Sequence, residues 1–320
     1  MQSGWYDRTT RRARDLSCGD TRVFVEFEVR RIECRDCGKV KREQLDFLSD
    51  NPFYTKRFGL VVGRRCRAAS IQDVAKEFHL DWHTVKELDK QYMQVQLDRA
   101  SKPAPKVIGV DEISIRKGHT YRIVVSDLVR ARPIWFGGED RSESMQQFFE
   151  ALGKRNSARI RLAVMDRWKP FRHATNTAAP QAAILFDTFH ISRRENLSSD
   201  GRQSLKTLLS ANQRLNTAYL LKESFGQWWS YEREGWARRF FENWKDALKW
   251  QRLKPYEKFA EMIDRHWNGI AAYCKSENKV SPGFVEGLNN TIRVIQRRAY
   301  GLRDEEYLNF KILTCMLPTL

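Results

Sequence analysis

The sequence predicts a mixed α/β protein in which a small β region and two short helices precede a larger domain with a five-stranded mixed sheet and a helical insertion. Three observations lead to this class. Apolar and polar residues alternate over residues 21–33, apolar residues recur at helical spacing over residues 70–92, and short apolar runs alternate with helical segments beyond residue 106. With 320 residues, of which 41% are hydrophobic, the chain can bury a core, which excludes a disordered protein.

The charge balance points to a polyanionic partner. Lys and Arg number 57 against 40 Asp and Glu, a formal net charge of +17, which favours nucleic acid ahead of a membrane surface. No apolar run approaches the roughly 18 residues of a membrane helix, and the start of the chain lacks an apolar signal core. We therefore expect a cytoplasmic protein associated with the nucleoid, with its six cysteines reduced.

The N-terminal region, residues 1–50, combines a strand with a pair of cysteines. Residues 21–33 alternate with period two, which is typical of a half-buried antiparallel strand, and they lead into Cys34-Arg35-Asp36-Cys37-Gly38. Cys34 and Cys37 have the spacing of half a zinc site, but a structural zinc takes four ligands. The only earlier cysteine, Cys18, lies in a predicted hairpin turn. Bound zinc and two free thiols in a turn both remain open.

Residues 51–100 have the pattern of a helix-turn-helix. Ser70 is placed as the N-cap of one helix, and a second apolar-periodic run follows a tight connection at His79-Leu80. Helical hairpins of this size also occur in proteins that never touch DNA, but the flanking segment 56–67 adds five basic and no acidic residues. We expect the second helix to enter a major groove. Its predicted DNA contacts are Trp82, His83, Lys86 and Lys90.

A proline-broken linker, residues 101–106, separates this part from residues 107–320, the predicted larger domain. Three apolar runs with short connections come first, followed by helix, strand, helix and strand. The five predicted strands cover residues 106–114, 120–128, 132–138, 161–166 and 182–187. The segment 193–279 is almost wholly helical, and its aromatic residues are expected to form a helical core rather than a base-stacking platform.

Two of these apolar runs end in a carboxylate, Asp111 and Asp166, and a third ends in Asp187. A carboxylate after a buried run is costly unless it is paired, solvated or bound to a cation. The alternative, in which each Asp caps the next helix, suits Asp166 better than Asp111, because Asp111 continues into more sheet. The pattern therefore favours a metal site.

A late helix around Glu286 has two contrasting faces. At 100° per residue, a carboxylate, an amide and two guanidinium groups align on one face, and apolar side chains occupy the other. A merely solvated face is the alternative, but such a face rarely carries arginines without acids. The polar face comprises Glu286, Asn290, Arg293 and Arg297, and the apolar face comprises Leu288, Ile292, Ile295 and Ala299.

The fragments VIGVDEISIRKG, AVMDRWKPF, AAILFDTFH and above all VEGLNNTIRVIQRRAYGLRD resemble the ISL-three family of bacterial insertion-sequence transposases. The resemblance implies an RNase H-like catalytic domain of the DDE type with a helical insertion, behind a zinc-binding region and a helix-turn-helix. It also implies that Asp111, Asp166 and Glu286 bind two Mg²⁺ or Mn²⁺ ions and that the protein cleaves and transfers DNA strands as a homodimer on element ends. Residues expected to support this triad are Glu112, Asp187 and His190.

Two features depart from the family pattern. The family has a complete set of cysteines at the N-terminus, whereas only Cys34 and Cys37 form a pair here. Ile191 leads almost directly into Arg193-Arg194-Glu195-Asn196, where the family has a longer connection. An impaired transposase remnant that acts only by binding DNA is therefore the alternative function. A repair nuclease or resolvase with the same fold is a third.

Overall fold

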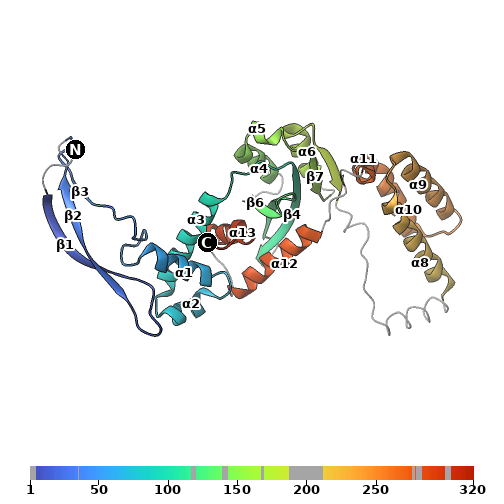
Figure 1. Cartoon of the computed structure of the whole chain (residues 1–320). Coiled ribbons are helices and arrows are strands. Elements are labelled where there is room, and N and C mark those ends of the chain that lie inside the picture. Colours follow the sequence, from blue (N-terminus) through green and yellow to red (C-terminus); the bar gives the residue numbers. More distant parts are fainter. Residues whose placement is uncertain are drawn as a thin grey trace. The chain divides into compact units, whose positions relative to one another are not determined.

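The computed structural model describes residues 5–34, 36–116, 120–138, 143–166, 169–186, 212–275, 278, 283–299 and 304–320. The chain forms two compact units. Figure 1 shows its helices and strands, coloured by their position in the sequence. Unit 1 consists of Met1–Lys102 with Thr291–Leu320, and unit 2 consists of Pro103–Asn290. The last thirty residues thus group with the N-terminal part of the chain, whereas the sequence placed them in the domain 107–320.

Unit 1 begins with a three-stranded antiparallel sheet in the order β1-β2-β3. The alternation predicted for the second strand is present, because Val29 is buried while its neighbours in sequence are exposed. Phe27, on the same face, packs edge-on against Phe47 with ring centroids 5.2 Å apart. The strands are β1 (Trp5–Arg14), β2 (Phe24–Glu33) and β3 (Val40–Arg42).

Three helices follow: α1 (Lys56–Arg65), α2 (Ile71–Phe78) and α3 (Trp82–Arg99). The predicted N-cap is confirmed, since the Ser70 hydroxyl accepts the backbone N–H of Asp73 at 3.1 Å. His79 then adopts a left-handed conformation, φ 51°, which ends α2 and lets the chain turn into α3. Where α1 crosses α3, a Cβ on Gly63 would lie 2.2 Å from the Cβ of Tyr92, so only glycine fits there.

The last helix of the chain, α13 (Glu305–Thr314), belongs to unit 1 and packs on α3 around a fully buried carboxylate. The Lys311 ammonium lies 2.6 Å from the Asp89 carboxylate, and the Tyr307 hydroxyl donates to the same oxygen. Lys311 also donates to the backbone carbonyl of Cys66 at 3.0 Å. Two donors on α13 thus meet two acceptors far away in sequence, and the buried charges of Lys311 and Asp89, which would be costly if unpaired, lie beside each other.

Unit 2 is built on a five-stranded mixed sheet in the order β6-β5-β4-β7-β8. Strands β4, β5 and β6 are antiparallel, and β7 and β8 are added parallel to β4. This confirms the predicted order of strands and helices. The strands are β4 (Val107–Arg116), β5 (Thr120–Asp127), β6 (Arg132–Gly137), β7 (Leu162–Met165) and β8 (Ala183–Phe186).

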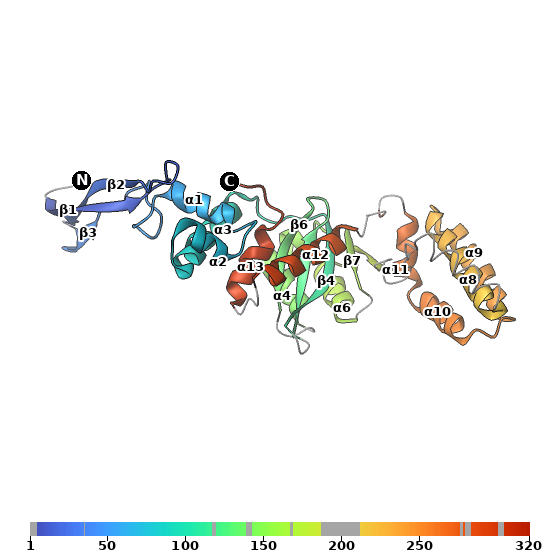
Figure 2. The same ribbon diagram turned by 90° about the horizontal axis from the view of Figure 1, so that it is seen from below.

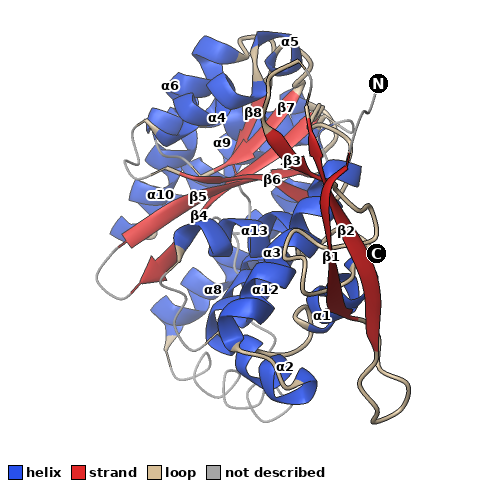
Figure 3. Cartoon of the chain, turned by 90° about the vertical axis from the view of Figure 1, so that its left-hand side faces the viewer, coloured by secondary structure: helices blue, strands red, loops and turns tan. Residues whose placement is uncertain are grey.

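Helices cover both faces of this sheet (Figure 3). Ile108 and Val110 of β4 face the helices α4 and α6, with which they share one core. The alternate β4 residues, Val107 and Gly109, face the opposite side, where the start of α12 packs. The helices are α4 (Ser144–Leu152), α5 (Lys154–Ser157), α6 (Lys169–Ala178) and α12 (Gly283–Arg298).

A helical insertion between β8 and α12 has its own aromatic core, as predicted (Figure 2). Phe186 of β8 is part of this core. Its ring has room because residue 269 is glycine: a Cβ there would lie only 2.3 Å from the ring. The sheet edge and the insertion therefore share one buried side chain. The elements are α8 (Gln213–Gly226), η2 (Gln227–Ser230), α9 (Glu234–Leu248), α10 (Lys254–Arg265), α11 (Trp267–Ala271) and η3 (Ala272–Cys274).

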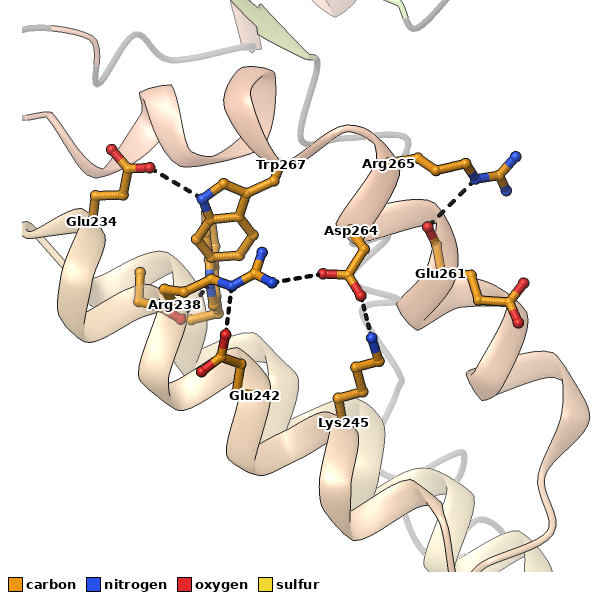
Figure 4. Close-up of polar contacts among 10 residues, drawn as sticks. Glu234, Arg238, Glu242, Lys245, Glu261, Asp264, Arg265 and Trp267 are labelled. Atoms are coloured by element: carbon orange, nitrogen blue, oxygen red, sulfur yellow. Dashed lines mark hydrogen bonds and ion pairs between the residues drawn. The ribbon is translucent and has the colours of Figure 1, made fainter.

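Ion pairs link α9 to α10 on the surface of the insertion (Figure 4). The Asp264 carboxylate binds the guanidinium of Arg238 at 3.0 Å and the ammonium of Lys245. Arg238 also pairs with Glu242 at 2.8 Å and lies over the Trp267 ring, 4.5 Å from its centroid. These contacts hold the helices in register around the aromatic core.

Candidate active site

Strand register brings Asp111 and Asp166 to the same edge of the unit 2 sheet. In the parallel pair of β4 and β7, Val110 is opposite Met165, and each aspartate is the next residue along its strand. Neighbouring strands lie about 4.8 Å apart, so the two backbones are adjacent at this point. Asp111 is half-buried and Asp166 is exposed. The two acids that the sequence singled out are therefore neighbours across the sheet.

Both oxygens of the Asp111 carboxylate have a protein donor. The backbone N–H of Glu112 donates to Oδ1 at 2.8 Å, and the side-chain amide of Asn289 on α12 donates to Oδ2. Asn289 reaches this carboxylate because α12 lies close to β4. A Cβ on Gly109 would be 3.0 Å from Cγ2 of Val285 and 2.9 Å from Cδ2 of Leu128. Glycine two residues before Asp111 thus permits the close approach.

Sequence reasoning missed Asn289 and chose its neighbour. The helical wheel was centred on Glu286, and Asn290 falls near that direction, whereas Asn289 lies about 60° to the other side. In the structure Asn290 is exposed and Asn289 is half-buried against the sheet. The only sequence signals for this contact were the doubled asparagine and the glycine at position 109.

The two faces of α12 agree largely with the pattern. Glu286 lies in the first turn and is exposed, as are the other members of its face, and Leu288 and Ile292 are buried on the opposite face. Val285 is also buried there, whereas Ile295 is half-buried and Ala299 is exposed, so the buried face ends earlier than predicted. The exposed face contains Glu286, Asn290, Arg293 and Arg297.

Within the described ranges, no three His, Cys, Asp or Glu side chains are close enough together to hold a metal ion. The donors nevertheless suit a hard divalent cation, because Asp111 and Asp166 supply carboxylate oxygens at one sheet edge. A further amide oxygen, Oδ1 of Asn289, is buried with no hydrogen-bond partner among the described residues. Glu286 precedes Asn289 by three residues, the spacing of neighbours on a helix.

The residues expected to support the triad have different outcomes. Strand alternation places the Glu112 side chain on the face of β4 opposite to Asp111, so it does not join Asp111 as expected. Asp187 and His190 lie outside the described residues.

The predicted recognition helix α3 divides into an open end and a covered face. Trp82 and His83 are exposed at its N-terminus, with their rings stacked 3.5 Å apart between centroids. Lys86 and Lys90, predicted to face DNA, instead point toward the start of α13. The Lys86 ammonium lies 2.5 Å from the Asp304 carboxylate, and the Lys90 ammonium lies 2.9 Å from that of Glu306.

These pairs are reflected in the acid–base chemistry of both partners. The hydrogen bond from Lys86 lowers the pKa of Asp304, and the hydrogen bond to Glu306 raises the pKa of Lys90. The charges of both lysines are thus engaged by Asp304 and Glu306, which are far away in sequence, and their contact with DNA stays a prediction.

The cysteine pair of the N-terminal region forms a tight turn after β2. The backbone N–H of Gly38 donates to the carbonyl of Cys34 at 2.7 Å, and backbone N–H groups of Cys37 and Asp36 lower the pKa of the Cys34 thiol. Cys37 and Cys18 are exposed. No third ligand joins Cys34 and Cys37 in the part of the chain that is described. Whether Cys34 and Cys37 bind zinc or are two free thiols therefore stays open.

Comparisons with known proteins place the chain among transposases. Residues 108–194 and 191–312 match the family described as "Transposase", and residues 43–93 match the "Helix-turn-helix domain of transposase family ISL3". The "Transposase for insertion sequence element IS1001" of Bordetella parapertussis is 30% identical over 345 residues, which cover 96% of this chain and 84% of that protein. The "Transposase for insertion sequence element IS1557" of Mycobacterium tuberculosis is 23% identical over 370 residues, covering 96% and 82%.

Fold and comparisons together define a transposase with a helix-turn-helix domain and a mixed α/β domain. The chain belongs to transposase family ISL3. Among the described helices, none is both long and apolar enough to cross a membrane.

Proposed function

We propose that this chain binds the ends of a bacterial insertion sequence and catalyses DNA strand cleavage and strand transfer with an RNase H-like, DDE-type domain. Asp111, Asp166 and Glu286 would hold Mg²⁺ or Mn²⁺ as hard oxygen ligands. When bound, such ions polarise the scissile phosphodiester and stabilise charge on the leaving oxygen. The order of strands in unit 2 supports this assignment, because Asp111 lies in the middle of β4 next to the end of β7, which Asp166 follows.

The chain's own residues have separate tasks in this proposal. Asp111, on the central strand and fixed by two donors, is the rigid part of the site. Asp166 contributes from the adjacent strand, and Glu286 from α12. In the first reaction water attacks the phosphodiester at the element end, and the 3′-oxygen of the element leaves as a hydroxyl. In the second reaction that hydroxyl attacks a phosphodiester of target DNA, which joins the element to the target while the 3′-oxygen of the target strand leaves as a hydroxyl.

DNA would be held by the exposed basic and aromatic groups. Trp82 and His83 at the open end of α3 are placed to contact bases, and Arg293 and Arg297 extend the Glu286 face with guanidinium groups that bind phosphates. Pairing of two element ends favours a homodimer on double-stranded DNA. A zinc ion on Cys34 and Cys37 would require two further ligands.

The observation that carries the proposal is the register of β4 and β7, which makes Asp111 and Asp166 neighbours. The family match shows that the chain that holds these two acids is a transposase. The test is Mg²⁺- or Mn²⁺-dependent cleavage of DNA carrying the element end, by wild type and by Asp111→Asn, Asp166→Asn and Glu286→Gln. Each variant keeps the side-chain shape and loses the charge, so cleavage is expected to disappear while DNA binding stays within a few fold. Glu261→Gln, an exposed acid on α10, is the matched control.

Cleavage that persists in any of the three variants would remove that residue from the triad. A DNA-binding remnant without catalysis is the second candidate. It is favoured by the family match, which comes in two pieces that meet at residues 191–194, where the sequence shows a shortened connection. A wild-type chain that binds the element end but never cuts it, at any concentration of either metal, would establish this alternative.

A further inference from the structure

Asn289 joins the start of α12 to the central strand of the unit 2 sheet. Its Nδ2 donates to Oδ2 of Asp111, and its own Oδ1 is buried without a hydrogen-bond partner among the described residues. Buried amide oxygens in proteins almost always have a partner, and water or an ion occupies that place where the protein supplies none. The Oδ1 of Asn289 is therefore an exception that calls for a partner such as a water or an ion.

Chemistry fixes which end of the amide faces the carboxylate. An ionised carboxylate can only accept hydrogen bonds, so the amide nitrogen must face Asp111 and the amide oxygen must face away from it. The opposite orientation would place two acceptors against each other. The Glu112 N–H occupies the other carboxylate oxygen at 2.8 Å, so the plane of the Asp111 carboxylate is held from two sides.

Backbone packing makes this contact specific. Gly109 faces the same side of β4 as Asp111, and the absent Cβ leaves the room into which Val285 of α12 packs. A Cβ at position 109 would lie 2.9 Å from Cδ2 of Leu128 and 3.0 Å from Cγ2 of Val285, so these two side chains would have to shift. The contact thus joins two segments that lie far apart in the sequence, Gly109 to Asp111 on β4 and Val285 to Asn289 on α12.

We propose that Asn289 is a positioning residue for Asp111. Its Nδ2 holds the carboxylate in the orientation that binds a divalent cation, and its Oδ1 accepts a hydrogen bond from water that hydrates the cation. This inference rests on the proposed function, because it assumes that Asp111 binds the metal.

The experiment measures Mn²⁺ binding to the full chain without DNA, by electron paramagnetic resonance, so that the readout is independent of activity. Loss of a side chain that orients a metal ligand typically weakens metal affinity about 10- to 100-fold. We expect that loss in Asn289→Ala and in Asn289→Leu, which keeps the side-chain volume. Asn216→Ala, a half-buried asparagine on α8, is the control and should bind Mn²⁺ like wild type. The circular dichroism spectrum of each variant shows that it is folded.

A second readout is the Mn²⁺ dependence of cleavage. A positioning role predicts that the Mn²⁺ concentration for half-maximal cleavage rises in both Asn289 variants, whereas a merely structural role lowers the amount of folded enzyme and leaves that concentration unchanged.

Asp111→Asn separates this inference from the proposed function. If Asp111→Asn abolishes Mn²⁺ binding while both Asn289 variants stay within twofold of wild type, the positioning role is wrong and the metal site stands. If Asp111→Asn binds Mn²⁺ like wild type, or if wild type binds none in the millimolar range, both the site and the positioning role are wrong.

Discussion

Replacing Lys311 by Met should destabilise the packing of α13 on α3. The Asp89 carboxylate is fully buried and lies 2.6 Å from the Lys311 ammonium, so the variant leaves a buried negative charge without its cation. Breaking a buried ion pair in this way destabilises proteins by about 3–5 kcal/mol. Because the Tyr307 hydroxyl still donates to Asp89, we expect the lower end, about 3 kcal/mol.

The assay is hydrogen–deuterium exchange of peptides from α3 and α13 in the full chain, which reports the local free energy of opening. The double variant Asp89→Asn, Lys311→Met is the control. It removes both charges and keeps an acceptor for Tyr307, so it should recover most of the loss. Exchange as fast in the double variant as in Lys311→Met, or unchanged in Lys311→Met alone, would refute the argument that unpaired charge is the cause.

The pH dependence gives a second check on the same variant. Burial raises the pKa of Asp89, so in the absence of Lys311 the folded chain takes up a proton at a higher pH than the unfolded chain does. Stability contributed by that proton is present at low pH and is lost as pH rises through the raised pKa. The difference between Lys311→Met and wild type should therefore shrink as the pH falls from 7.

Gly269→Val should loosen the contact between the insertion and β8, because the valine side chain would occupy the position of the Phe186 ring. Overpacking of this kind costs about 1–3 kcal/mol of folding free energy. Limited proteolysis should therefore cut the insertion faster in this variant, whereas the exposed control Gly235→Ala should stay resistant. Asp304→Asn with Glu306→Gln should release Lys86 and Lys90 and strengthen binding to any DNA, with a steeper dependence of log affinity on log salt measured by fluorescence anisotropy; an unchanged slope would show that these lysines do not reach phosphates. Arg297→Ala should instead weaken binding to all DNA sequences and reduce the magnitude of that slope by about one. A slope equal to that of wild type would show that Arg297 does not contact phosphates.

Local patterns in the sequence were sufficient for the elements and for two of the acids. The Ser70 cap and the alternation around Val29 are decided by neighbours in sequence, and both are present. Asp111 and Asp166 were found because each ends an apolar run, and the parallel register of β4 and β7 makes them neighbours, although β4 itself continues to Arg116.

Contacts between distant segments could not be predicted from such patterns. The charge of Lys86 looked available for DNA, and its partner Asp304 is separated from it by more than two hundred residues. Asn289 was passed over for the same reason, since only the close packing of α12 on Gly109 shows that it reaches Asp111. Helical spacing tells which residues share a face, but the element that covers that face is a property of the whole fold.

Unit 1 is assembled from both ends of the chain, and this has a consequence during protein synthesis. The segment Pro103–Asn290 is translated between the two parts of unit 1. At about 5–20 residues per second, the ribosome needs roughly 10–40 s to make this segment, and during that time Asp89 has no Lys311. The N-terminal helices therefore lack their contacts with α13 until the end of translation, so a nascent chain completes unit 1 only after the sheet of unit 2 has been made.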